Sequence, residues 1–180
     1  DVNEIDDQES VFISALSVPI DPSLLQDVVF EIEPMDDSVA APWRVLVAAD
    51  ALERLGEGFV LPLHGLYSDY QNTVSIEFNF IDKSTSTLLV PVQTDPHSFP
   101  VELKINQSVS TGRIPSFSYF YLKSFYGIVV LDIDGQLRWM PNEGINSISS
   151  TFDTDHFKVF LDDQMYELEL SGESKATTIE

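Results

Sequence analysis

The stretch TVSIEFNF, residues 73–80, decides the fold class of this chain. Apolar and polar side chains alternate along it without a break, which is the period of a β-strand with one buried face. The side chains expected to face the core are Val74, Ile76, Phe78 and Phe80. The segment VELKIN (101–106) shows the same alternation, so a second strand is expected there.

Most of the first hundred residues show a strand-like pattern of this kind. Only ADALERLG (49–56) has the pattern of a helical turn, which Gly56 would end. Short strands at even spacing, separated by turn residues, predict an antiparallel sandwich. The further strands are expected in VFISALSV (11–18), DVVFEIE (27–33), WRVLVAA (43–49), GFVLPL (58–63) and TLLVPV (87–92).

Composition excludes several classes of function. The 180 residues include 30 acidic and 9 basic side chains, a net charge of −21, and this surface would repel nucleic acids and anionic membranes. The chain has no cysteine, which excludes disulfides, thiolate metal sites and a cysteine nucleophile. No apolar run reaches the roughly 18 residues of a membrane span, so membrane insertion is not expected. The acidity fits an exported or marine-type protein, and the location expected for the chain is periplasmic or extracellular.

The stretch GIVVLDIDGQLRW, residues 127–139, allows two interpretations. Asp132 and Asp134 place two carboxylates on alternate residues before Gly135, as a cation-binding loop would. The same residues also suit a hairpin in which Asp134 and Gly135 supply the two positions that tolerate a positive φ. A cation loop needs further ligands at fixed later positions, and QLRWMPNE does not supply them in order.

A repeat favours the hairpin. IVVLDIDGQ (128–136) aligns with MYELELSGE (165–173) at an offset of 37 residues, and the second copy lacks one of the two carboxylates. Trp139 is then expected to pack between sheets. A repeat of about 40 residues with a recurrent hairpin is typical of a β-propeller blade. With a linker at NQSVSTGRIPS (106–116), the sequence predicts an all-β chain with a sandwich over 1–108 and a first blade with the start of the next over 109–180.

Three segments in order along the chain resemble the bacterial arylsulfate sulfotransferase family. HGLYSDYQNTVSIEF (64–78) resembles a strand of the family's immunoglobulin-like sandwich. GIVVLDIDGQLRW and DQMYELELSGE (163–173) resemble successive hairpins of its β-propeller. The resemblance implies sulfuryl transfer from an aryl sulfate to a phenol, through a transiently sulfated histidine and without a nucleotide sulfate donor, and no cofactor is expected. It also implies a homodimer in which the sandwich takes part.

The catalytic histidines of that family lie in later blades, which would follow residue 180. The chain's own histidines are His64, His97 and His156, and each is interpreted as a surface or turn residue. Arg138 is expected to stack on the neighbouring indole of Trp139. The sequence therefore assigns no catalytic, cofactor-binding or metal-binding residue to this chain, and predicts that it is inactive alone. The alternative is a complete extracellular sandwich protein for binding or adhesion.

Overall fold

A computed structural model gives the structure of the protein. It describes residues 2–5, 10–97, 118–124, 127–140, 150–153, 156–161, 164–170 and 174–178. The fold is all-β, as predicted, and the chain divides into two compact units, residues 1–97 and 98–180. The expected strand at 101–106, the linker at 106–116 and the expected domain boundary after residue 108 lie outside the described residues.

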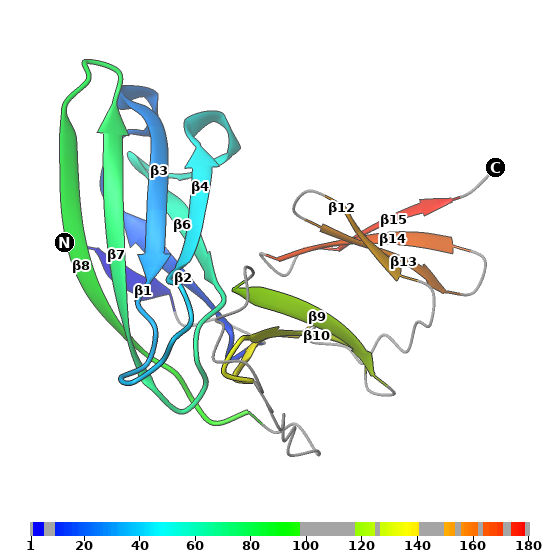
Figure 1. Ribbon diagram of the computed structural model, residues 1–180. Coiled ribbons are helices and arrows are strands. Elements are labelled where there is room, and N and C mark those ends of the chain that lie inside the picture. The colour runs from blue at the N-terminus through cyan, green and yellow to red at the C-terminus, as the bar shows by residue number, and fades with distance from the viewer. Residues whose placement is uncertain are drawn as a thin grey trace. The chain divides into compact units, whose positions relative to one another are not determined.

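Unit 1 contains two four-stranded sheets in a sandwich-like arrangement (Figure 1). Every strand in them pairs antiparallel with its neighbours. In the first sheet the strand order is β1 (Asn3–Ile5), β2 (Ile13–Val18), β6 (Gly58–His64), β5 (Glu53–Leu55). In the second it is β4 (Trp43–Ala48), β3 (Leu25–Ile32), β7 (Gln71–Phe80), β8 (Thr85–Gln93).

Alternating side chains of both sheets form the core of unit 1. Val74, Ile76 and Phe78 on β7 are buried, which confirms the prediction for these positions, whereas Phe80 at the strand end is only half-buried. The facing sheet contributes Leu16 and the alternate residues of β6. The largest buried apolar side chains of this core include Phe12, Phe30, Phe59, Leu61 and Leu63.

The segment 49–56 forms less helix than the sequence suggested. A single 3-10 turn covers Ala49–Ala51, and the chain then enters β5. Gly56 follows with φ of +62° in the turn that leads to β6. A second 3-10 turn at Pro22–Leu24 begins at Asp21, whose carboxylate accepts a hydrogen bond from the Ser23 amide. Both turns connect strands and leave the all-β class unchanged.

Unit 2 also contains two antiparallel sheets. One has the order β11 (Leu137–Trp139), β10 (Gly127–Asp132), β9 (Tyr119–Ser124). The other is a four-stranded meander of β12 (Ser150–Asp153), β13 (His156–Leu161), β14 (Gln164–Glu169) and β15 (Ser174–Thr178).

The two sheets of unit 2 repeat each other at the spacing found in the sequence. β13 begins and ends 37 residues after β9, and β14 begins and ends 37 residues after β10. The pairing repeats as well, since Gly127 faces Ser124 in one sheet and Gln164 faces Leu161 in the other. The pairing also repeats in the next hairpin of each sheet, where Leu131 lies opposite Leu137 and Leu168 lies opposite Ser174. Strand bounds and register therefore share one period.

The turn between β10 and β11 is a hairpin, but not the two-residue turn that the sequence suggested. The Gly135 amide donates to the Asp132 carbonyl at 2.9 Å, and the Asp132 amide donates to the Gln136 carbonyl at 3.0 Å. Gly135 has φ of +84°, whereas Asp134 is not among the residues with positive φ. Only one position needs the left-handed conformation, because the turn is followed by a bulge residue that lengthens the loop.

Candidate functional site

The three histidines have different positions in the structure. His97 lies at the end of unit 1, with its ring centroid 6.0 Å from that of Phe12. His156 is the first residue of β13, and its side chain is outside the description. His64, the last residue of β6, is only 8% exposed. The interpretation of His64 as a surface or turn residue was therefore wrong.

His64 is enclosed by aromatic rings. Its imidazole meets Phe30 edge-on, with centroids 5.5 Å apart and planes at 86°, and meets Trp43 at 5.8 Å and 88°. Its buried Nδ1 atom has no hydrogen-bond partner within the described part of the chain. Because a charged imidazole loses its hydration in this setting, burial lowers the pKa of His64 to about 4. The ring is neutral at pH 7.

The next residue, Gly65, allows this packing. It has φ of +86°, and a Cβ atom placed on it would overlap the Trp43 indole. Glycine is therefore required for two reasons, since it reaches the left-handed region without strain and leaves room for the ring. The amides of Gly65 and Leu66 both donate to the Phe12 carbonyl, at 3.0 and 3.2 Å, which fixes the corner after β6.

A fully buried asparagine, Asn72, connects the corner between β6 and β7 to β8. Its side-chain oxygen accepts from the Tyr67 amide at 2.8 Å, and its side-chain nitrogen donates to the Tyr67 carbonyl at 3.0 Å. The Thr94 hydroxyl donates to the same carbonyl. All of these contacts involve backbone groups or a neutral hydroxyl. The Asn72 side chain therefore satisfies backbone groups at the corner, where strand pairing does not.

Unit 2 contains a buried ion pair that sequence reasoning did not identify. Asp132 and Arg138 are both 0% exposed, and Arg138 Nη1 lies 3.4 Å from Asp132 Oδ2. The other carboxylate oxygen accepts from the amides of Asp134 and Gln136, at 3.1 and 2.9 Å. Asp132 therefore stabilises the hairpin turn and neutralises a buried guanidinium. Asp134 is exposed whereas Asp132 is buried, and within the described residues neither belongs to a group of three side chains that could hold a metal ion.

Arg138 and Trp139 point away from each other, contrary to the predicted stacking. Neighbouring residues of a strand face opposite sides of the sheet, and the Arg138 guanidinium carbon lies 5.7 Å from the ring centroid of Tyr119 instead. Trp139 is 1% exposed, and its indole nitrogen donates to the Leu170 carbonyl at 2.8 Å. Leu170 occupies in the second repeat the place of Ile133 in the first, so Trp139 links the two copies.

No family model matches the chain, and no curated protein matches it either. Within the described residues, no group of three histidine, aspartate or glutamate side chains lies close enough to hold a metal ion. No helix in that part of the chain is long and apolar enough to cross a membrane. The described polar clusters around Asn72 and Asp132 hold the corner between β6 and β7 and the turn between β10 and β11.

Proposed function

We propose that the chain is a structural module in which an immunoglobulin-like sandwich precedes propeller-type repeats. The 37-residue period shared by strand bounds and pairing register in unit 2 is the observation that carries this proposal. The second copy, β12 to β15, is a four-stranded antiparallel meander, which is the architecture of a propeller blade. The hydrogen bond from Trp139 to Leu170 supports it further, because blades of a propeller contact their neighbours in sequence.

The strand order of unit 1 supports the immunoglobulin-like part. When β1 to β8 are lettered A, B, C, C′, D, E, F and G, one sheet becomes A-B-E-D and the other becomes C′-C-F-G. This order matches that of the two sheets of an immunoglobulin-like domain with one added strand, which supports the proposal. The bonds around Tyr67 and Asn72 lie at the corner between strands E and F, where such domains commonly place a buried tyrosine.

For the complete gene product we propose arylsulfate sulfotransferase activity, with this chain as the non-catalytic portion. The three segments that resemble the family support it, because each lies in the part of the chain where the resemblance expects it. The segments 127–139 and 163–173 contain the equivalent strands β10 and β14 of unit 2, and 64–78 spans the corner before β7 and most of that strand in unit 1. In this proposal a histidine in further repeats attacks the sulfuryl group, the phenolate leaves, and the acceptor phenol then takes the sulfuryl group from the histidine.

The test measures nitrophenol release from nitrophenyl sulfate with a phenol as acceptor. The 180-residue chain should give no turnover, and the product of the complete gene should give turnover in a periplasmic or extracellular preparation. If the product of the complete gene folds but gives no turnover, the sulfotransferase proposal is wrong. The alternative, a binding or adhesion protein, would then be favoured. Turnover by the chain alone that disappears in His156→Ala would contradict the assignment of catalysis to other repeats. His97→Ala serves as the matched control, since it removes a histidine of unit 1.

A further inference from the structure

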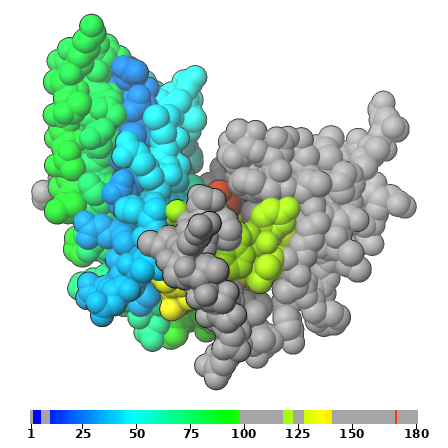
Figure 2. Space-filling view, in the orientation of Figure 1, coloured from blue at the N-terminus to red at the C-terminus, as the bar shows by residue number. Residues whose placement is uncertain are grey.

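Three chain segments meet at one end of unit 1. They are residues 19–24 between β2 and β3, residues 49–57, which lead from β4 through β5 to β6, and residues 81–84 between β7 and β8. The Ile81 amide donates to the Leu24 carbonyl at 3.0 Å, which joins the first segment to the third. Arg54 Nη1 lies 3.4 Å from Asp21 Oδ1, which joins it to the second. The three segments lie at the upper end of unit 1 in Figure 1 and project there in Figure 2. We name this end the loop surface.

The loop surface exposes aliphatic side chains, although loops and turns usually carry polar ones. Leu24 is 51% exposed, Leu55 is 49% exposed, and Ile81 is 66% exposed, the highest value for a large apolar residue in the described part of the chain. Leu24 and Ile81 are neighbours, because the hydrogen bond between their backbones joins the two loops. A single exposed leucine is common on a protein surface, whereas adjacent aliphatic side chains at loop tips indicate a site of interaction.

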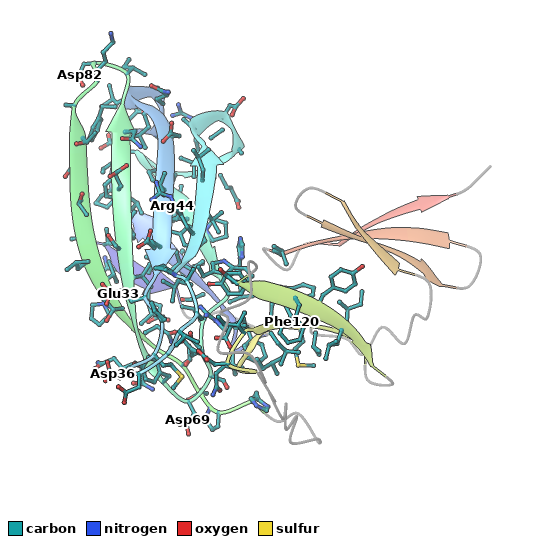
Figure 3. All side chains as sticks on the ribbon, in the orientation of Figure 1. Glu33, Asp36, Arg44, Asp69, Asp82 and Phe120 are labelled. Atoms are coloured by element: carbon teal, nitrogen blue, oxygen red, sulfur yellow. The ribbon has the colours of Figure 1, made fainter. Side chains whose placement is uncertain are left out.

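Hydrogen bonds hold the loop that presents Ile81. Asp82 is labelled at the tip of the β7–β8 hairpin in Figure 3, and its Oδ1 accepts from the Ser84 amide at 2.9 Å and from the Ser84 hydroxyl at 2.6 Å. Lys83 has φ of +70°, and its amide donates to the Phe80 carbonyl at 2.9 Å. The loop that presents Leu24 is held by its capped 3-10 turn. Because both loops are already ordered, a partner that binds them pays little conformational entropy for the contact.

The apolar residues of the loop surface are surrounded by negative charge. Its three segments contain five carboxylates and two cations. Hydrogen bonds from Ser23 lower the pKa of Asp21, and hydrogen bonds from Ser84 lower the pKa of Asp82, so both carboxylates are charged at neutral pH. Arg54 offsets part of the charge of Asp21, whereas Asp82 has no described cation within ion-pair distance. The loop surface therefore combines an apolar centre with a negative rim.

We propose that the loop surface docks a cationic, apolar segment of another protein. An aliphatic or aromatic side chain of that segment packs on Leu24 and Ile81, and a neighbouring lysine or arginine pairs with Asp82. Both bonds from Ser84 go to Oδ1 of Asp82, so the partner's cation pairs with Oδ2. The positions of the loops support binding at this end. In the strand lettering used above they are the B–C and F–G loops, which bind the antigen in antibody variable domains.

Charge selects this partner over the other candidates. A second copy would bring the same negative rim against its own, and two chains of net charge −21 repel each other. Nucleic acids and anionic membranes are repelled for the same reason. A cationic segment is attracted at long range by the net charge and at contact by Asp82. This inference goes beyond the proposed function and depends on unit 1 alone, so it can fail or hold whatever the outcome of the sulfotransferase assay.

The affinity of the 180-residue chain for a fluorescent peptide of lysine and leucine residues tests the apolar part of the loop surface. Ile81→Ser should weaken binding about tenfold, because loss of a central apolar contact removes a large share of the binding free energy. Leu89→Ser, on β8, is the matched control, since Leu89 is 63% exposed, and it should bind like the parent. Equal affinities of the two variants would overturn the proposal. A concentration-dependent dimer that Ile81→Ser abolishes would also overturn it, because the occupant would then be a second copy.

Two amide substitutions test whether the charge acts at this surface or through the whole chain. Asp82→Asn keeps an oxygen that can accept from Ser84 but removes the charge, so it should weaken peptide binding and reduce its dependence on salt. Asp36→Asn, an exposed position at the other end of unit 1 in Figure 3, is the control and should change neither. Equal losses in the two variants would show attraction by net charge alone and contradict the site. Equally tight binding of a peptide with glutamate in place of lysine would contradict the cationic partner.

Discussion

Acid should destabilise unit 1 through His64. The ring is neutral and buried in the folded protein, with a pKa of about 4, whereas in an unfolded chain the imidazole has its ordinary pKa of 6.5. The unfolded state therefore binds more protons below pH 6.5, and the free energy of unfolding falls as the pH falls. The contribution is complete above pH 6.5 and is lost progressively down to about pH 4.

The two pKa values set the size of the effect. A difference of one pKa unit corresponds to about 1.4 kcal/mol, so unfolding should become easier by about 2 kcal/mol at pH 5 and about 3 kcal/mol at pH 4. The side chain is 8% exposed, so little of this effect is screened by solvent. Carboxylates also titrate in this range, and the large negative charge falls with pH. A matched variant is needed to separate those contributions from that of His64.

His64→Leu is that variant, because leucine has a similar volume, suits the aromatic surroundings and cannot be protonated. Urea unfolding at pH 7, 5 and 4, followed by tryptophan fluorescence, should show that the stability difference between variant and parent changes with pH by the amounts above. Trp43 reports the transition of unit 1, since its ring contacts His64. A difference between the two proteins that stays constant from pH 7 to 4 would refute the argument. It would mean that the imidazole is hydrated in the folded state.

Two substitutions test the cores of the two units. Phe78→Ala should lower the free energy of unfolding of unit 1 by about 3–5 kcal/mol, because the ring is 3% exposed, and an unchanged thermal midpoint would exclude Phe78 from the core. Asp132→Asn should destabilise unit 2 by about 3–5 kcal/mol, because it leaves the Arg138 guanidinium buried without a counter-charge. The double change with Arg138→Met should recover part of that loss, and no recovery would contradict the pairing.

Strand periodicity was enough to predict the fold class. The alternation in TVSIEFNF placed Val74, Ile76 and Phe78 in the core, and the offset of two short segments predicted the period of unit 2. Both predictions depend on local sequence patterns. In such a pattern, the face of the strand on which a side chain lies follows from its position relative to its neighbours. The same alternation, continued two residues toward the N-terminus, reaches Asn72. Its burial could have been predicted there if the strand had been extended.

Features that depend on contacts between distant residues could not be predicted from pattern. His64 follows the inward residues Phe59, Leu61 and Leu63, so alternation would place it outward, whereas in the structure it packs against rings of β3 and β4. The ion pair of Arg138 was missed because the spacing suggested a neighbour, Trp139, rather than a partner across the hairpin. Lys83 has φ of +70° in a turn that resembles the one at Gly135, and no glycine marks it.

The shared period of unit 2 limits how its length can change. An inserted or deleted residue within a copy would move every following strand out of step with its counterpart, and a shift by one residue turns side chains to the opposite face. A change of 37 residues adds or removes a complete set of strands and leaves each remaining hairpin in register. Duplication of such a segment is therefore the tolerated route by which this part of the gene can lengthen.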